Sequence, residues 1–247
     1  MVRVALITGA SSGIGLALCK NFLTNNTDIT IIAVCRDRSK LDDLAGQFAG
    51  RLRIVVADIS IDEGRTTIVE TIKDLPTIDY LVHCAAVVTP LSQLQKINYI
   101  DWQICLQTNV DAPVFLTLKL LKQLSYSRVL FLTSDATLQP VYGAASYCVS
   151  KMALHMAYAC LKTEISIEKT VFGLVAPGNV DTPMQKRIRM TDPKDLPIAT
   201  AMTDVYEKNR LLTPEIVASY LSKLLLVLSR EVFESKCWNI YEDLQLP

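Results

Sequence analysis

Short apolar runs alternate with longer segments of helical pattern along this chain, and this alternation limits the fold more than any other feature of the sequence. The runs are residues 2–8, 30–35, 52–57, 79–85, 127–133, 169–176 and, with a weaker pattern, 237–241. Helical patterns between them lie near residues 14–25, 39–49, 62–73, 98–123, 146–167 and 213–229. The runs are mainly apolar and do not alternate between apolar and polar residues, as expected for strands that helices cover on both faces. The sequence therefore predicts an α/β fold, a doubly wound parallel sheet of about seven strands with helices on both faces.

We expect a single domain that spans residues 1–247. The length suits one sizeable core, and the chain contains no internal repeat, low-complexity tract or Gly/Ser linker. The segment 177–212 differs from the rest because it is irregular and rich in proline. It follows the sixth run, and ligands of open α/β sheets bind outside the carboxyl ends of the strands. We therefore interpret residues 178–212 as a substrate lid; a long surface loop without that role is the alternative.

The composition argues against several classes of partner. Lys plus Arg and Asp plus Glu both total 25, so nothing indicates a general attraction to nucleic acid or anionic membranes. No apolar stretch reaches the ~18 residues that indicate a membrane span. The apolar start of the chain is broken at Thr8 and Gly9, unlike the core of a secretory leader. Neither nucleic acid nor a membrane is an expected partner, and we expect a cytoplasmic protein.

The cysteines and histidines do not have the pattern of a metal site. The seven cysteines form no CxxC pair, which argues against a zinc site or a disulfide framework and for reduced thiols. Only two histidines are present, His83 and His155, so no metal is expected. His155 follows Lys151 by four residues, and a place beside a functional site stays open for it. A packed or solvated helix histidine is the preferred interpretation.

A glycine-rich turn, TGASSGIG, directly follows the first apolar run and precedes a helical pattern. Glycines at 9, 13 and 15 let the chain turn sharply and let backbone N–H groups approach a phosphate, while the next helix offers its positive N-terminus. The spacing Gly-x-x-x-Gly-x-Gly differs from the commoner dinucleotide fingerprint. In this strand–turn–helix context the turn predicts a dinucleotide site.

Tyr147 and Lys151, in SYCVSK, lie four positions apart on a predicted helix and therefore share one face. Ser134 stands thirteen residues before the tyrosine. A tyrosine ordinarily titrates near 10, and a neighbouring ammonium lowers the pKa by favouring the phenolate. Such a pair suits general acid–base work. Spacing alone, however, favours a core tyrosine beside a lysine whose amine extends to solvent.

Five motifs occur together and in order: TGASSGIG, Asn109-Val110, Ser134, YCVSK and PGNVDT at 177–182. Jointly they resemble the short-chain dehydrogenase/reductase family over nearly the whole chain. The resemblance implies a Rossmann-type domain that binds NAD or NADP and transfers hydride between the nicotinamide and a carbonyl or alcohol. It favours the acid–base interpretation of the tyrosine and lysine.

The resemblance also implies roles for four residues. Ser134 would polarise the substrate oxygen, and Tyr147 would donate the proton during reduction. Lys151 would lower the tyrosine pKa and hold the nicotinamide ribose. Asn109 would orient a water that links the lysine to solvent. These four are the expected catalytic residues.

Further residues are expected to bind the cofactor. Asp58, after the third run, resembles the family's adenine-contacting aspartate, although Ser60 or Asp62 beside it could simply cap the next helix. Thr182 resembles the threonine that hydrogen-bonds the nicotinamide carboxamide. The full expected set is Gly9, Ser11, Ser12, Gly13, Ile14, Gly15, Arg36, Asp58, Tyr147, Lys151, Pro177, Gly178, Val180 and Thr182.

The residues after the second run predict NADPH as the cofactor. An acid at the end of this strand suits the free ribose hydroxyls of NAD, whereas a basic residue accommodates the 2′-phosphate of NADP. Cys35 occupies the place of the acid usual in NAD-selective members, and Arg36 matches the arginine of NADP-preferring ones. A shift of one residue in register would instead bring the Asp37 carboxylate toward the ribose, and a solvated turn is the other interpretation.

Two departures from the family pattern bear on the substrate and on assembly. His83, Cys84, Ala85 and Ala86 stand where members usually read Asn-Asn-Ala-Gly, which narrows the space beside the cofactor. The C-terminal stretch FESKCWNIYEDLQLP lacks the family's usual glycine-rich ending and is more similar to the sepiapterin and benzil reductase branch. That resemblance implies a reductase of a ketone or diketone, and it favours a homodimer over the common homotetramer.

The substrate pocket is expected to form from segments 135–142 and 178–212, with Val141, Tyr142, Met184 and Met202 as apolar contacts. Two other functions are alternatives. A non-catalytic NADP-binding regulator or redox sensor would be expected to carry a damaged Tyr-x-x-x-Lys motif, which is intact here. An epimerase or dehydratase of the same superfamily is usually longer and spaces the turn glycines differently. The sequence thus favours an NADPH-dependent carbonyl reductase.

Overall fold

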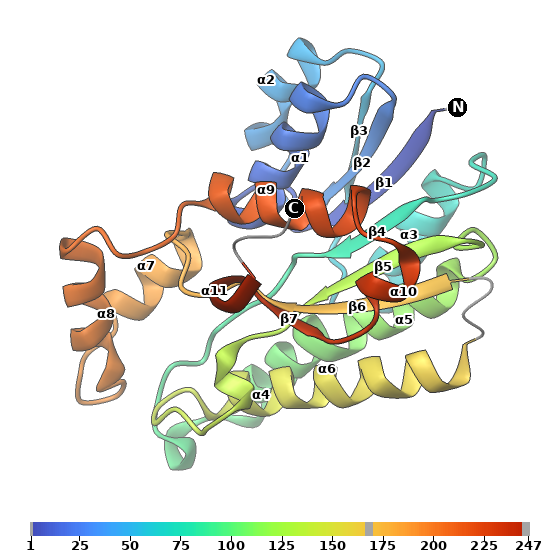
Figure 1. Cartoon of the computed structure of the whole chain (residues 1–247). Coiled ribbons are helices and arrows are strands. Elements are labelled where there is room, and N and C mark those ends of the chain that lie inside the picture. Colours follow the sequence, from blue (N-terminus) through green and yellow to red (C-terminus); the bar gives the residue numbers. More distant parts are fainter. Residues whose placement is uncertain (1, 166–169, 244–247) are drawn as a thin grey trace.

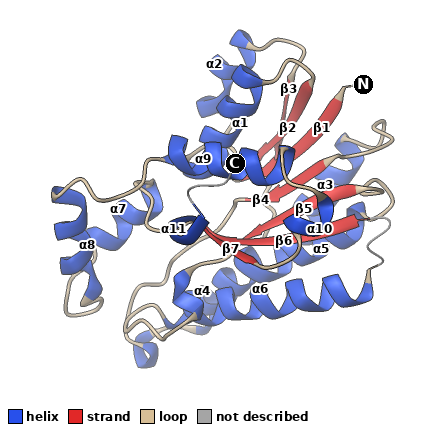
Figure 2. Ribbon diagram, in the orientation of Figure 1, coloured by secondary structure: helices blue, strands red, loops and turns tan. Residues whose placement is uncertain are grey.

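The computed structural model describes residues 2–165 and 170–243, and within them seven strands form one parallel sheet. The order of strands is β3-β2-β1-β4-β5-β6-β7 (Figures 1 and 2). Their bounds are β1 Arg3–Thr8, β2 Ile29–Cys35, β3 Leu52–Val56, β4 Tyr80–His83, β5 Ser127–Leu132, β6 Thr170–Ala176 and β7 Cys237–Asn239. The order reverses between β1 and β4, as in a doubly wound sheet. The predicted fold class is confirmed.

Helices cover both faces of the sheet (Figure 2). The principal ones are α1 Gly13–Asn25, α2 Ser39–Gln47, α3 Asp62–Thr71, α4 Tyr99–Leu106, α5 Ala112–Leu120, α6 Ala145–Glu164 and α9 Pro214–Leu226. Shorter ones are α7 Pro183–Arg189, α8 Ile198–Glu207, α10 Arg230–Phe233 and α11 Ile240–Asp243. Helices α1 and α9 pack on one face, and α3, α5 and α6 pack on the other.

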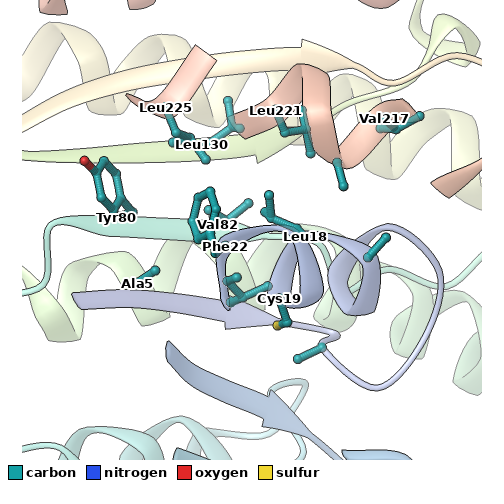
Figure 3. Packing of buried hydrophobic residues seen from close by; sticks show 14 of the residues in the cluster. Ala5, Leu18, Cys19, Phe22, Tyr80, Val82, Leu130, Val217, Leu221 and Leu225 are labelled. Atoms are coloured by element: carbon teal, nitrogen blue, oxygen red, sulfur yellow. The ribbon is translucent and has the colours of Figure 1, made fainter. Parts of the chain in front are cut away.

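Successive residues of the central strands β1, β2, β4 and β5 enter different hydrophobic cores. In β1, Ala5 and Ile7 pack with α1 and α9, whereas Leu6 packs with α3, α5 and α6. Figure 3 shows the first of these cores, where Phe22 of α1 and Leu221 of α9 meet Val82 of β4. Side chains alternate between the faces of a strand, so a strand that is covered twice must be apolar at every position. This is the physical origin of the unbroken apolar runs.

The segment predicted as one helix over 98–123 contains an irregularity. It is α-helical over Tyr99–Leu106 and Ala112–Leu120, but residues Gln107–Asp111 form a π-helical turn. There the Ala112 N–H donates to the Gln107 carbonyl, five residues earlier. Such wide turns occur mostly as single interruptions of α-helices and often at functional sites. Apolar periodicity does not reveal them.

The expectation that residues 177–212 are irregular was wrong in part, because α7 and α8 lie within this segment. The prolines suggested broken structure, but Pro183 is the first residue of α7 and Pro197 precedes the first residue of α8. Proline fits the first turn of a helix, where its missing N–H has no partner to lose. Thr182 caps α7 by accepting a hydrogen bond from the Gln185 N–H at 3.2 Å.

Three other boundaries differ from expectation or fall outside the described residues. The last strand ends at Asn239, so residues 240 and 241 begin α11 rather than extending β7. The predicted helix end at 166–167 and the strand start at 169 lie outside the described residues. Among the helices of the described part, none is long and apolar enough to cross a membrane.

Candidate active site

A cleft of about 450 Å³ opens at the carboxyl ends of β1, β2, β3 and β4. Its walls are the turn from Gly9 to Gly15, the ends of β2 and β3, the segment 84–89 after β4, and the first part of α7. The cleft therefore lies where the strand order reverses, which is the expected place for a ligand in this class of sheet.

The glycines of the turn are required by close packing. Gly9 has a φ of +66°, and a Cβ there would lie 2.8 Å from the Cα of Ala85. A Cβ on Gly15 would overlap the carbonyl oxygen of Gly9. Gly13 has a φ of +52°, and its Cβ would lie 3.0 Å from Cγ2 of Thr182. The turn is therefore wedged between the segment after β4 and the start of α7, with its backbone facing the cleft.

This turn suits the pyrophosphate of a dinucleotide. Ser12 precedes the first residue of α1, but its side chain makes no capping hydrogen bond to the helix. The first N–H groups of α1 therefore remain available at the positive end of the helix dipole, next to a backbone without Cβ atoms. Anion binding in the cleft is the chemistry that this arrangement favours.

The end of β2 supplies charges of both signs to the cleft. Arg36, Asp37 and Lys40 all line it, together with Cys35. The Asp37 carboxylate accepts a hydrogen bond from the Ser39 N–H at 3.0 Å, which helps to keep its pKa below the usual range. The Asp37 carboxylate is thus bound within the local turn, while Arg36 and Lys40 contribute two positive charges to the cleft.

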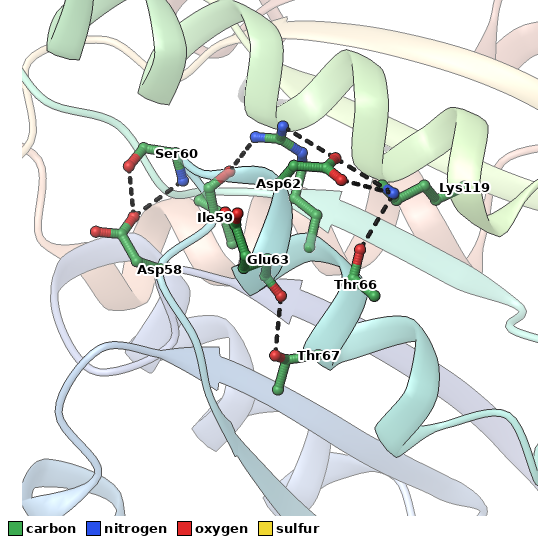
Figure 4. Close-up of polar contacts among 9 residues, drawn as sticks. Asp58, Ile59, Ser60, Asp62, Glu63, Thr66, Thr67 and Lys119 are labelled. Atoms are coloured by element: carbon green, nitrogen blue, oxygen red, sulfur yellow. Dashed lines mark hydrogen bonds and ion pairs between the residues drawn. The ribbon is translucent and has the colours of Figure 1, made fainter.

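Asp58 also lines the cleft, just after β3. Its carboxylate accepts hydrogen bonds from the Ser60 N–H at 2.9 Å and the Ser60 hydroxyl at 2.7 Å (Figure 4). Burial opposes ionisation, but these bonds and the charge of Arg36 outweigh it and hold the pKa of Asp58 below its usual value. Neither Ser60 nor Asp62 caps α3 through its side chain, because Asp62 pairs with Arg65 and Lys119 instead.

A second polar group forms where β5 ends and α6 begins. Lys151 is 4% exposed, and its Nζ donates to the Leu132 carbonyl at 2.8 Å. The same Nζ lies 5.7 Å from the centre of the Tyr147 ring, as expected for positions four residues apart on a helix. Burial lowers the pKa of Lys151 to about 8. A cation with an unusually low pKa thus lies beside a phenol.

The pKa of Tyr147 differs from expectation. Burial raises it to about 12, although a hydrogen bond with Ser134 acts in the opposite direction. The sequence led us to expect a pKa lowered by Lys151, but the Nζ lies over the ring and is held by a backbone carbonyl. Without a bound cofactor, Tyr147 is therefore firmly protonated at neutral pH, the form that donates a proton.

Asn109 lies in the π-helical turn and is 1% exposed. Its amide donates to the Val87 carbonyl at 2.8 Å and to the Ser150 hydroxyl at 2.9 Å, and its Oδ1 accepts from the Val87 N–H at 2.8 Å. Both amide hydrogens are therefore used by protein groups. The side chain joins the cleft wall at Val87 to α6, the helix that carries Tyr147 and Lys151.

The expected cofactor residues divide into two sets. Those lining the cleft are Gly9, Ser11, Ser12, Gly13, Ile14, Gly15, Arg36, Asp58 and Thr182, and those outside its lining are Tyr147, Lys151, Pro177, Gly178 and Val180. Gly178 has a φ of +73°, and a Cβ there would lie 2.8 Å from the Tyr241 ring. The Tyr241 hydroxyl also accepts from the Asn179 N–H at 2.8 Å. Gly178 thus fits against α11, while Val180 is buried in the main core.

Segment 183–207 covers the tyrosine. Leu196 and Ala199 are buried with Ala144 in a small apolar cluster, against which Tyr147 and Ile188 pack. Of the residues expected to contact substrate, Val141 belongs to this cluster and Met184 lines the dinucleotide cleft. Tyr142 is largely exposed and Met202 is partly buried. The segment predicted as a lid therefore packs over Tyr147.

Sequence reasoning missed several residues that line the cleft, among them Lys40, Thr108 and Arg187. Lys40 lies at the start of α2, and its distance of four residues from Arg36 could have suggested a shared site. Arg187 could not be found, because the helix that carries it was predicted as irregular chain.

Comparison with known proteins agrees with this geometry. Residues 3–193 match the short chain dehydrogenase family. A benzil reductase ((S)-benzoin forming) of Saccharomyces cerevisiae is 31% identical over 242 residues, covering 92% of this chain and 91% of its own. The benzil reductase ((S)-benzoin forming) of Bacillus cereus is 29% identical over 236 residues, covering 91% and 94%.

Solved structures lead to the same family. A short chain dehydrogenase/reductase from Saccharomyces cerevisiae superposes with a TM-score of 0.89 at 27% identity, covering 99% of this chain and 97% of its own. The matched region includes the glycine turn, Ser134, Tyr147 and Lys151. This chain belongs to the short chain dehydrogenase family and is an oxidoreductase.

Proposed function

We propose that this protein is an NADPH-dependent reductase of ketones or diketones, with Tyr147 as its proton donor. The observation that carries the proposal is the position of Tyr147, with the Lys151 amine 5.7 Å from the centre of its ring and an apolar cluster packed against it. The similarity to benzil reductases supports a diketone or an aryl ketone as the substrate class. We further propose that it acts in the cytoplasm.

The turn and cleft fit a dinucleotide, with the glycine turn and the start of α1 holding the pyrophosphate. When bound, the reduced nicotinamide supplies the hydride. Ser134 and Tyr147 hydrogen-bond the substrate oxygen, and the phenol gives its proton as negative charge develops there. Lys151 stabilises the resulting phenolate and, by the family resemblance, holds the nicotinamide ribose. Asn109 keeps the cleft wall and α6 in register through Val87 and Ser150.

The pKa values support the direction of reduction. Reduction needs the neutral phenol, which a pKa of about 12 guarantees throughout the neutral range. It also needs the positive charge of Lys151, which is lost as the pH rises through about 8. We expect kcat/KM for ketone reduction to be flat below pH 7 and to fall above pH 8. A rate that rises between pH 8 and 10 would contradict this assignment.

Replacing Tyr147 with Phe tests the proposal directly. Tyr147→Phe keeps the ring in its cluster but removes the proton, so turnover of benzil should fall by at least about a thousandfold. The NADPH dissociation constant should change less than about threefold, because the ring still fills its place. A variant that kept normal turnover while binding NADPH normally would overturn the assignment.

Cofactor preference rests on the cations at the end of β2. Arg36 and Lys40 both line the cleft and suit a 2′-phosphate, while Asp37 is engaged with the Ser39 N–H. We expect wild-type kcat/KM to favour NADPH over NADH, and Arg36→Ala to lower that ratio by about tenfold. A wild-type preference for NADH would reverse the proposal.

A homodimer is the assembly that the surface supports, with a homotetramer as the alternative. Exposed apolar side chains gather on the neighbouring helices α4, α5 and α6: Tyr99, Ile100, Ile104, Phe115, Met152 and Met156. Exposed apolar side chains that gather on neighbouring helices are typical of a protein–protein interface. Light scattering should give twice the monomer mass, and Ile100→Glu should shift it toward the monomer; a monomeric wild type would refute the proposal.

A further inference from the structure

Helix α7 carries a cation into the dinucleotide cleft. Pro183, Met184 and Arg187 all line the cleft, and their positions i, i+1 and i+4 place them on one side of the helix. The chain reaches this wall only after β6, far in sequence from the glycine turn, yet Thr182 at the head of α7 lies directly against Gly13. The cation is therefore brought to the phosphate-binding side of the cleft by tertiary structure.

Within the described part of the chain, no other protein group binds the guanidinium of Arg187. No hydrogen bond or ion pair of its side chain is found within residues 2–165 and 170–243. Its neighbour Arg189 behaves differently, since it pairs with Asp181 at 3.2 Å and bonds Gln185. One arginine of α7 thus fastens the helix to its own loop, and the other faces the cleft.

The same short helix is also part of the cover over Tyr147. Ile188, the next residue after Arg187, packs in the cluster that includes Tyr147 and Leu196. Helix α7 therefore has one side on the dinucleotide cleft and another on the apolar cluster that packs against Tyr147. A contact between α7 and a bound dinucleotide would therefore also stabilise the position of the cover over Tyr147.

We propose that Arg187 binds the pyrophosphate of the cofactor and thereby fastens α7, with the attached cover, over the substrate. The proposal rests on the proposed function, because it requires a dinucleotide in the cleft. A planar guanidinium suits two phosphate oxygens at once. The 2′-phosphate is assigned to Arg36 and Lys40, which line the cleft from the end of β2 and the start of α2, whereas Arg187 lines it from α7, the helix that begins beside Gly13 of the glycine turn. Arg187 is thus assigned to the part that NADPH and NADH share.

Equilibrium binding of both dinucleotides tests the assignment without relying on turnover. Dissociation constants of NADPH and NADH would be measured by fluorescence titration for Arg187→Ala, Arg187→Gln and the wild type. The control is Lys186→Ala, which removes a cation from the adjacent exposed position of α7 that does not line the cleft. We expect about tenfold weaker binding of both dinucleotides for the Arg187 variants and less than about twofold change for the control.

The salt dependence of binding and limited proteolysis of α7 provide two further tests of the Arg187 contact. At 0.5 M NaCl the gap between wild type and Arg187→Ala should narrow, because the contact is between exposed charges. NADPH should slow tryptic cleavage after Lys186 and Arg189 in the wild type more than in Arg187→Ala, since the dinucleotide no longer fastens the helix.

Three outcomes would overturn the inference. Unchanged affinity for both dinucleotides would show that Arg187 makes no contact, and a loss confined to NADPH would place it on the 2′-phosphate. An equal loss of dinucleotide affinity in Lys186→Ala would show that the effect comes from the overall positive charge of the surface and not from a contact of Arg187. A wild type that binds neither dinucleotide would instead refute the proposed function, so the two failures are distinguishable.

Discussion

The two sides of the active site are built in different ways. The dinucleotide side is continuous with the main cores, because the glycine turn directly joins β1 to α1, whose buried residues pack beneath the sheet. The side that we propose for the substrate is segment 183–207, which rests on a small cluster whose buried apolar residues are Ala144, Leu196 and Ala199. Figure 1 shows α7 and α8 set apart from the body of the sheet, beyond its carboxyl edge.

This difference indicates a division of mechanical roles. A turn wedged against Ala85 and Thr182 cannot rearrange without disturbing the sheet. The cover, in contrast, buries little apolar area and can detach at small cost, as expected of an element that admits a substrate. Changes on the dinucleotide side should therefore affect folding and cofactor binding together. Changes in the cover should affect the substrate while leaving overall stability almost intact.

The largest effect is expected at Gly9. Gly9→Ala forces a positive φ on a residue with a Cβ and drives that Cβ to 2.8 Å from the Ala85 backbone. NADPH binding should weaken more than about a hundredfold, and the midpoint of thermal unfolding should fall. The control is Gly46→Ala in α2, whose Cβ meets nothing within 4 Å and which should stabilise the protein by up to ~1 kcal/mol. Normal binding and stability in Gly9→Ala would remove the contrast between the two sides.

Truncating one buried leucine in each region compares the main core with the cover directly. Leu221 in α9 is 0% exposed and Leu196 in the cover is 1% exposed, so both truncations to alanine delete similar buried volume. Leu221→Ala should lower the free energy of unfolding by about 3 kcal/mol. Leu196→Ala should lower it by less than about 1 kcal/mol, because the cover can detach locally, while KM for the ketone rises several-fold. Urea unfolding and steady-state kinetics provide the two readouts, and equal losses of stability would refute the division.

His83 should make the dinucleotide side sensitive to acid. The Thr117 hydroxyl donates to the Pro113 carbonyl at 2.7 Å, so it accepts from Nε2 of His83 at 2.9 Å, and the buried Nδ1 has no partner. Burial lowers the pKa of His83 to about 3, whereas a histidine in the unfolded chain has the ordinary pKa of about 6.5. The unfolded state therefore binds the extra proton below pH 6.5, and stability falls as the pH decreases through that value.

At pH 5.5 this linkage costs about 1.4 kcal/mol relative to pH 8. His83→Asn, the residue usual in the family, should lose this part of the pH dependence when unfolding is followed in urea at both pH values. An identical slope of stability against pH in the variant and the wild type would show that His83 is not its source.

The smallest effect is expected at an ion pair on the cover. Lys96 and Asp195 are 3.1 Å apart, and their side chains are 54% and 37% exposed. Exposed pairs contribute little after solvent screening and side-chain entropy, so Lys96→Met should change the free energy of unfolding by less than ~0.5 kcal/mol. KM for the ketone should change less than about twofold. A larger rise in KM would mean that charge, rather than the apolar cluster, holds the cover in place.

The parts of this molecule that sequence predicts well are those fixed by local rules. Doubly covered strands must be apolar at each position, and the turn after β1 must have glycine where a Cβ would collide, so both leave unmistakable patterns. Prolines were misleading at 183 and 197, because the same residue that breaks a helix also suits its first turn. The sequence could not tell these cases apart without the capping bond from Gln185 to Thr182.

The electrostatics of the site were less predictable. The spacing of Tyr147 and Lys151 predicted a shared helix face, which the structure confirms. It could not predict that the lysine amine is held by the Leu132 carbonyl or that burial dominates the tyrosine pKa. Likewise, the amide of Asn109 is taken up by Val87 and Ser150, partners on two other segments of the chain. Such terms depend on three-dimensional surroundings that a linear motif does not contain.

The π-helical turn at Gln107–Asp111 has a consequence for how this chain can vary. An uninterrupted α-helix advances about 100° per residue, so every position of a long helix has a fixed orientation relative to every other. The π-helical turn contains one extra residue, so this fixed relation between positions ends there. The outward faces of α4 and α5 are therefore not fixed by the inward direction of Asn109. Deleting one codon in this turn would leave a helix of ordinary pitch but rotate one half against the other. The extra residue therefore determines whether the amide of Asn109 can point inward while the apolar side chains of α4 and α5 stay on the surface.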